Sequence, residues 1–172
     1  GVLFSAAYTQ SPVCMPARGS LASGLYPHNH GFWSNFTGRK FPAELITLFH
    51  DIQDAGYTTG KVGKYHYYNP EWGESHEDYR DYYDQLGLDW AKELPTPYMG
   101  PYLKNEYTEH LKRQGLLDAY LEDTAYRFET GDNDVVRPSP LPPEDHPDGY
   151  IARQALAYID QCARGQPMFL CV

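Results

Sequence analysis

An amphipathic helix that leads directly into a short strand occurs twice in this chain, once toward each end. Residues 42–55 carry apolar side chains at helical spacing, and Gly56 separates them from a strand expected over 57–62. The same order of helix and strand is expected near the other end, with a helix over 149–163 and an apolar strand over 168–172. Because alternating helices and strands form sheets covered by helices, the pattern predicts an α/β fold.

The chain between these two units has a different composition, rich in Tyr, Asp, Glu, Pro and Gly. The other elements that we expect are helices over 16–24, 75–86, 106–114 and 116–128, and a proline-rich loop over 132–147. We interpret residues 67–147 as an irregular helical insertion, preceded by residues 1–66 and followed by a closing helix and strand over 148–172.

The charge balance excludes some classes of partner. The 14 Lys and Arg residues against 23 Asp and Glu residues give a formal charge of −9 at pH 7, so we expect no nucleic-acid partner. No apolar run approaches the roughly 20 residues that a spanning helix needs, so we expect no membrane span.

Aromatic residues make up 15% of the chain, including 16 Tyr, which indicates a folded protein with a surface that holds a ligand.

Both ends of the chain lie within apolar sequence. Val2, Leu3 and Phe4 open it, and it stops inside the apolar run 168–172. Since termini usually lie at the surface, we expect residues 1–172 to be an incomplete portion of a larger domain.

The most unusual segment spans residues 11–24 and contains Cys14, one of three cysteines in the chain. Cys14 precedes Pro16, a residue type favoured in the first turn of a helix, and a helix N-terminus favours negative charge. Arg18, one turn further along, adds a fixed cation. The segment would suit an anion, but an isolated cysteine is also commonly a small buried apolar residue. These residues alone leave both interpretations open.

A second unusual segment contains Lys64 and His66, just after a predicted strand. Ligands tend to lie beyond the carboxyl ends of strands in α/β sheets, and side chains two residues apart face the same way in an extended segment. An ammonium and an imidazole placed there can point at one anion. A nucleotide-binding P-loop does not fit, because Gly56 and Gly60 lack its spacing and Tyr65 stands where its Ser or Thr would be.

Both segments resemble signatures of one family. The matching residues of the first segment are Cys14, Pro16, Arg18, Leu21 and Gly24. They resemble the signature of the type I sulfatases, the formylglycine-dependent branch of the alkaline phosphatase superfamily, although Met15 and Ala22 depart from the commonest residues there. Residues 56–66 resemble the second sulfatase signature, a Gly-Tyr-x-Thr strand that ends in Gly-Lys-aromatic-His.

The resemblance implies an alkaline-phosphatase-like mixed sheet flanked by helices, and the hydrolysis of sulfate esters. It implies that a formylglycine-generating enzyme oxidises Cys14 to formylglycine, whose hydrated aldehyde is the nucleophile. Arg18 would orient the nucleophile and help to hold its charged form. Lys64 and His66 would bind the sulfate oxygens and assist at the nucleophile and the leaving oxygen. The substrate would be a sulfated small molecule or carbohydrate.

The resemblance also implies a divalent cation, usually calcium, that assists ionisation of the diol. Its expected ligands are an aspartate pair before Gly1 and an Asp-Asn pair after Val172, so we expect no metal ligand in this chain. We therefore expect these residues alone to be inactive, and the complete protein to be periplasmic or secreted. His28 and His30 would shape the pocket without binding the ion, and Asn35 begins a glycosylation sequon.

Two other functions stay open from the sequence. A phosphonate monoester or phosphodiester hydrolase of the same superfamily would use the same residues, because both kinds of ester present tetrahedral anionic oxygens. A noncatalytic carbohydrate-binding module would keep Cys14 as a thiol. The Tyr and Trp side chains of residues 65–102 would then form a stacking surface, but packing of the insertion explains them equally well. The residues do not identify the substrate alcohol, so sugar, aryl and choline sulfates remain candidates.

Overall fold

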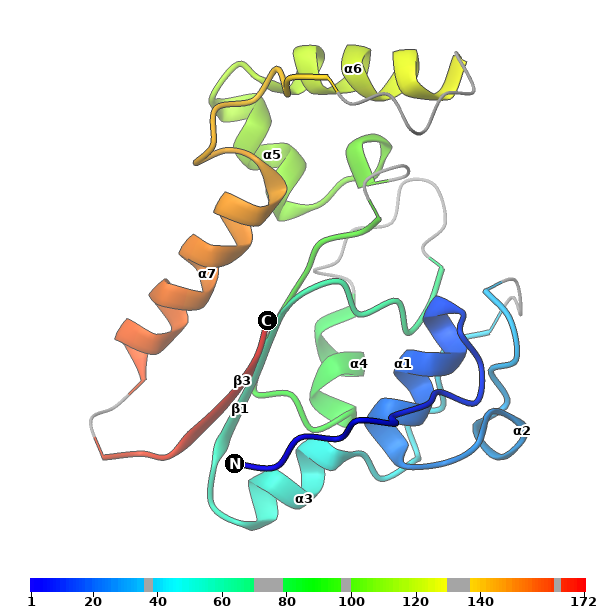
Figure 1. Cartoon of the computed structure of the whole chain (residues 1–172). Helices are drawn as coiled ribbons and strands as arrows, with labels where there is room; N and C mark the ends of the chain where they lie inside the picture. Colours follow the sequence, from blue (N-terminus) through cyan, green and yellow to red (C-terminus); the bar gives the residue numbers. More distant parts are fainter. Residues whose placement is uncertain (36–38, 70–78, 97–99, 130–136, 163–164) are drawn as a thin grey trace.

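The computed structural model describes residues 1–35, 39–69, 79–96, 100–129, 137–162 and 165–172. The predicted α/β fold is confirmed. Within these residues, the parallel strands β1 (Thr58–Gly63), β2 (Trp90–Glu93) and β3 (Met168–Cys171) form a sheet in the order β2-β1-β3. Helix α7 (Pro147–Gln161) covers one face, and α3 (Leu48–Asp54) and α4 (Arg80–Gln85) lie on the other (Figure 1).

Further helices occur outside this central unit. They are α1 (Cys14–Ser23), α2 (Pro27–His30), α5 (Glu106–Arg113), α6 (Leu117–Glu129) and the short 3-10 helix η2 (Gly100–Tyr102). Helices α1, α5, α6 and α7 lie within a few residues of their predicted positions. Of the helix predicted over 75–86, α4 is observed, and residues 75–78 lie outside the described part. Among the residues described, no helix has the length and apolar character needed to cross a membrane.

Strand β1 is the central strand, and glycine is required at its middle. Gly60 lies opposite Trp90 of β2 and Leu170 of β3. A Cβ atom at Gly60 would lie 2.8 Å from the ring of Tyr158 on α7 and 3.1 Å from Leu170. A larger residue would therefore push α7 away from the sheet.

Helix α3 begins later than predicted, so the expected start at residue 42 is wrong. Thr47 is the N-cap residue: its hydroxyl accepts a hydrogen bond from the N–H of Phe49 at 3.2 Å. The N–H of Thr47 donates to Nδ1 of His50 at 3.1 Å, and its hydroxyl donates to the carbonyl of Leu86 at 2.7 Å. A threonine that bonds the backbone in this way starts a helix rather than continuing one.

The insertion contains a strand that the sequence pattern does not predict. Strand β2 has four residues and shows no regular alternation of apolar and polar side chains. It is held beside β1 by Thr59, whose N–H donates to Oδ2 of Asp89 at 2.8 Å and whose hydroxyl donates to the carbonyl of Gly87 at 2.6 Å. The segment 67–147 is thus joined to the sheet and does not merely lie over it.

Aromatic side chains fill two buried clusters. The first lies among α1, α3, α4 and the turn after β1, and it includes Met15, Phe41, Phe49, Tyr65, Tyr68, Tyr79 and Tyr83. The second lies among β2, α5, α6 and α7, and it includes Leu94, Tyr107, Leu111, Tyr120 and Tyr150. The tyrosines of the first cluster therefore pack in the core and do not form an exposed stacking surface.

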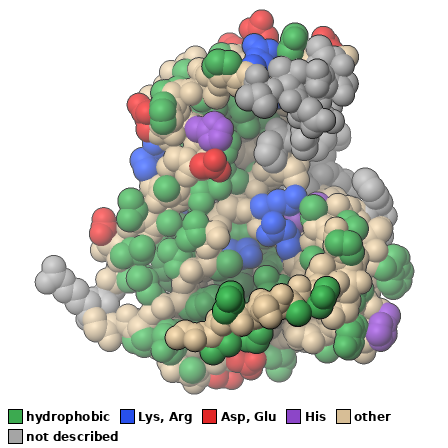
Figure 2. Space-filling view, in the orientation of Figure 1, with side chains coloured by type: hydrophobic (Ala, Val, Ile, Leu, Met, Phe, Trp, Pro, Cys, Tyr) green, Lys and Arg blue, Asp and Glu red, His purple; other side chains and the backbone are tan. Residues whose placement is uncertain are grey.

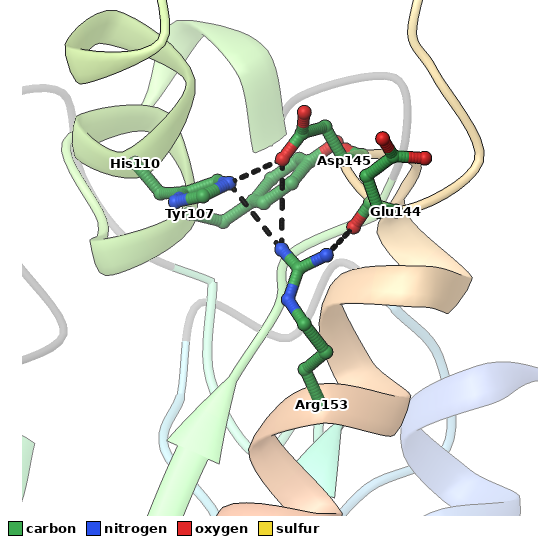
Figure 3. A network of polar contacts seen from close by, with 5 residues as sticks. All are labelled: Tyr107, His110, Glu144, Asp145 and Arg153. Carbon is green, nitrogen blue, oxygen red and sulfur yellow. Dashed lines mark hydrogen bonds and ion pairs between the residues drawn. The ribbon is translucent and has the colours of Figure 1, made fainter.

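A polar network holds α5 against α7 (Figure 3). Nε2 of His110 lies 2.7 Å from Oδ1 of Asp145, and Nη2 of Arg153 lies 3.5 Å from the same oxygen. Arg153 also donates to the carbonyl of Glu144, and the hydroxyl of Tyr107 donates to the carbonyl of Asp145 at 2.8 Å. These contacts fix the second cluster beside the carboxyl ends of the strands.

Candidate active site

Cys14 is the first residue of helix α1. Val13 is the N-cap residue, with an extended backbone, and no side chain of its own caps the helix. The N–H of Met15 donates instead to the side-chain oxygen of Asn35 at 2.9 Å. Cys14 is half-buried, and the positive end of the helix dipole lies beside its sulfur. This local structure favours a negative charge at residue 14.

The turn after β1 brings Lys64 to Cys14. Gly63 ends the strand with a φ of 97°, a conformation that glycine adopts without strain. Nζ of Lys64 then lies 3.4 Å from Sγ of Cys14. Nη1 of Arg18 donates to the carbonyl of Lys64 at 2.6 Å, which ties α1 to this turn. The structure therefore brings together three of the four predicted site residues.

The surroundings of Cys14 favour its thiolate. Burial raises the pKa of the Cys14 thiol. The hydrogen bond and positive charge of Lys64 lower this pKa, and so do a hydrogen bond with Asn35 and the charge of Arg18. Together they hold the pKa below its ordinary value. Figure 2 shows Lys and Arg side chains gathered beside a histidine near the middle of one face of the molecule.

His66 lies in the same turn. The expectation that Lys64 and His66 face the same way assumed an extended segment, and the backbone here is not extended. The strand ends before Lys64, and His66 has a φ of 56°, which is rare for residues other than glycine. Oε1 of Glu93 accepts the N–H of Tyr65 at 3.3 Å and the N–H of His66 at 2.8 Å. The other carboxylate oxygen of Glu93 accepts the hydroxyl of Tyr83. Glu93 therefore fixes the unusual backbone of this turn.

The ring of His66 is placed by Asn69. The amide nitrogen of Asn69 donates to the carbonyl of Asn35 at 2.7 Å, so its oxygen faces Nε2 of His66 at 3.1 Å. Nε2 is then the donor of a neutral ring, and Nδ1 carries the lone pair. Nδ1 is buried and has no hydrogen-bond partner within the described part of the chain.

The pKa of His66 is lower than usual. Burial is the main cause, and the positive charges of Lys64 and Arg18 add to it, against the hydrogen bond with Asn69 that raises the pKa. The neutral ring is therefore the form that dominates at pH 7.

Sequence reasoning missed three residues of this site. Asn35 was noticed only as the start of a sequon, whose other residues lie outside the described part of the chain, and Asn69 and Glu93 carried no signal. Each makes a hydrogen bond to a residue of the site. Asn35 accepts the N–H of Met15, Asn69 bonds the ring of His66, and Glu93 accepts the N–H of His66. No short motif links such distant positions, so only the fold reveals them.

The two histidines of the His28-Asn29-His30 segment do not converge. His30 is buried, its Nε2 lies 3.0 Å from the hydroxyl oxygen of Ser20, and its Nδ1 accepts the N–H of Phe32 at 3.2 Å. His28 is exposed and stacks on Tyr26. His30 therefore packs α2 against α1.

Nothing in the described ranges brings three or more His, Cys, Asp or Glu side chains together in a way that could hold a metal ion. The groups closest to Cys14 are the cations of Lys64 and Arg18, which would repel one. The surroundings of Cys14 in the described ranges therefore do not fit a calcium site.

A further lysine lies beneath the site. Lys61 on β1 is only 6% exposed, and its Nζ lies 3.8 Å from Sγ of Cys171 and 5.2 Å from the ring centre of Tyr65. Burial lowers the pKa of Lys61. Cys14, Cys162 and Cys171 are all free thiols.

The comparisons with known proteins agree on one family. A family model described as Sulfatase matches residues 1–172. The chain is similar to the uncharacterized sulfatase YidJ of Escherichia coli, with 43% identity over 67 residues, which cover 38% of this chain and 13% of that protein. Arylsulfatase K of Xenopus laevis is 37% identical over 67 residues, covering 39% of this chain and 12% of the relative. The extracellular sulfatase SULF-1 homolog of Drosophila melanogaster is 38% identical over 85 residues, covering 43% and 8%.

Two solved structures have a similar fold. Ps i-CgsB in complex with k-i-k-neocarrahexaose matches with a TM-score of 0.53 and 16% identity, covering 94% of this chain and 34% of that one. The phosphonate monoester hydrolase of Agrobacterium radiobacter matches with a TM-score of 0.55 and 14% identity, covering 94% and 31%. The chain thus spans about a third of these structures, and its matched segments span 13% or less of the curated relatives. The match to the family model over all 172 residues shows that the chain belongs to the sulfatase family.

Proposed function

We propose that the complete protein hydrolyses sulfate esters through a formylglycine made from Cys14. The observation that carries the proposal is the contact between Nζ of Lys64 and Sγ of Cys14 at 3.4 Å, at the N-terminus of α1. Membership of the sulfatase family supports the reaction class. A sulfated small molecule or carbohydrate would be the substrate, and a formylglycine-generating enzyme would be a partner.

The residues around Cys14 fit a formylglycine. The side chain is half-buried and faces a lysine donor, so an oxygen in place of the sulfur would accept a hydrogen bond from Lys64. One hydroxyl of the hydrated aldehyde would attack sulfur and break its bond to the ester oxygen, which leaves as the alcohol. The second hydroxyl would then lose its proton and reform the C=O bond as the C–O bond to sulfate breaks. Lys64 would bind sulfate oxygens. Arg18 would fix the position of Lys64 relative to the nucleophile through its hydrogen bond to the Lys64 carbonyl.

His66 would take part in proton transfer. As a neutral ring with Nε2 bonded to Asn69, it could accept at Nδ1 the proton that the attacking hydroxyl of the diol loses. The ring that results is a cation, which would then donate to a sulfate oxygen or to the leaving oxygen. The lowered pKa of His66 suits a group that must begin the reaction deprotonated.

Kinetics on the complete protein, coexpressed with a formylglycine-generating enzyme, test this function. Cys14→Ala should abolish the turnover of 4-nitrophenyl sulfate, because no other side chain of the site can supply the diol. Cys162→Ala, at the end of α7, is the matched control and should keep wild-type kcat and KM. Turnover by the Cys14→Ala protein would contradict the mechanism. Faster hydrolysis of the phosphonate monoester 4-nitrophenyl phenylphosphonate than of the sulfate would favour the phosphonate hydrolase alternative.

A further inference from the structure

A cavity of about 190 Å³ opens beside Lys64, at the carboxyl end of β1. Its walls come from the segment after β2, from η2 and from helices α5, α6 and α7, so the insertion supplies most of them. Ile151 of α7 lies against the strand end, since a Cβ atom at Gly63 would be 3.7 Å from its Cδ1. Lys64, whose Nζ reaches Cys14, is therefore also part of the cavity wall.

Apolar groups form most of the wall. They come from Leu94, Pro95, Pro101, Pro147 and Ile151 and from the rings of Tyr107 and Tyr120. The two rings pack edge to face, with centres 5.9 Å apart. An apolar wall of this kind favours an apolar ligand, because each polar group that enters must give up its hydrogen bonds to water.

Part of the polar surface in the wall is occupied by the fold itself. The amide nitrogen of Asn105 donates to the carbonyls of Gly100 at 3.0 Å and Leu103 at 2.9 Å, and its oxygen accepts the N–H of Thr108 at 2.9 Å. The hydroxyl of Tyr107 donates to the carbonyl of Asp145. The carboxylate of Asp148 also lies in the wall and is exposed to solvent. A sugar has several hydroxyls that need partners, and a mostly apolar wall leaves most of them without one.

We infer that this cavity receives the leaving group of the substrate and that the leaving group is an apolar ring, as in an aryl sulfate. The inference rests on the proposed function, because it is the sulfate at Lys64 and Cys14 that would place the rest of the ester here. A cavity of about 150 Å³ holds a benzene ring, so the volume suits one phenyl-sized group. The ammonium of Lys64 at one end and apolar walls beyond it match a ligand with an anionic head and an apolar body.

Binding to the complete protein in a Cys14→Ala background tests the inference without turnover. Calorimetric titration with 4-nitrophenyl sulfate and with glucose 6-sulfate would be repeated after Ile151→Asn, which puts an amide into the apolar wall. We expect Ile151→Asn to weaken the aryl ester about tenfold, the scale of a small change in an apolar pocket, and to leave the sugar ester nearly unchanged. Ile159→Asn on the same helix is the control, because Ile159 is exposed and outside the cavity.

The results separate the two proposals. Equal Kd values for the aryl ester with and without Ile151→Asn, or an equal loss for both esters, would overturn the leaving-group pocket. If the aryl ester binds as expected but the protein with an intact Cys14 and its maturation enzyme hydrolyses neither ester, then the proposed function fails and the pocket remains only a binding site.

Discussion

Cys14 and His66 lie in one positive field that acts on both in the same direction. Lys64 and Arg18 lower the pKa of each, which favours a thiolate at Cys14 and a neutral ring at His66. Burial acts differently on the two groups because it disfavours whichever form is charged. It raises the pKa of Cys14 and lowers that of His66. The site therefore favours deprotonated groups, as a nucleophile and a general base require.

The state of His66 predicts a pH dependence. If neutral His66 must accept a proton, kcat/KM falls as pH drops through the pKa of His66. That pKa lies below the ordinary value of about 6.5, so the acid limb of the pH profile should lie below pH 6.5. His66→Asn should lower activity and remove this limb from the residual rate. His28→Asn, which changes an exposed histidine, should keep the limb, and a limb that persists in His66→Asn would assign the titration to another group.

At the scale of elements, the site depends on a contact between the end of β2 and the turn after β1. Strand β2 ends at Glu93, and that carboxylate accepts two successive N–H groups of the turn after β1. Successive backbone N–H groups in a tight turn form an anion-binding concavity, and here an internal carboxylate fills it. The neighbouring strand thus holds Lys64 and His66 in place.

Glu93 is therefore predicted to be a positioning residue. Glu93→Ala should lower kcat/KM about 100-fold, the cost expected when catalytic groups move by about 1 Å. Glu93→Gln should recover part of the activity, because an amide oxygen still accepts both N–H groups. Glu122→Ala, an exposed change on α6, is the control. If thermal unfolding shows all of these variants folded and Glu93→Ala keeps wild-type kinetics, the positioning role is wrong.

The same elements explain what the sequence could predict. Lys64 and His66 belong to a short contiguous motif after a strand that follows the Gly56 stop of a helix, so both the strand and the place of these residues at its end could be predicted. Strand β2 is too short to show a pattern, and it is fixed by Thr59 bonding to Asp89 across the fold. The start of α3 depends on a threonine that also bonds Leu86, a contact that no local propensity contains.

At the scale of the whole molecule, the site lies where two packed regions meet. The cluster around Met15, Phe49 and Tyr65 supports α1 and the turn after β1. The cluster around Tyr107, Tyr120 and Tyr150 supports the cavity walls on the other side of Lys64. In this account one region carries the nucleophile and the anion-binding cations, and the insertion carries the pocket for the leaving group.

The central claim is that Cys14 works as an aldehyde, and mass spectrometry of the peptide that contains it tests that claim most directly. The complete protein would be produced with and without a formylglycine-generating enzyme, and the mass of the Cys14 peptide measured beside the rate of sulfate ester hydrolysis. We expect the mass decrease that accompanies replacement of the thiol by an aldehyde, and a rate proportional to the modified fraction. A fully active preparation in which Cys14 is an intact thiol would contradict it.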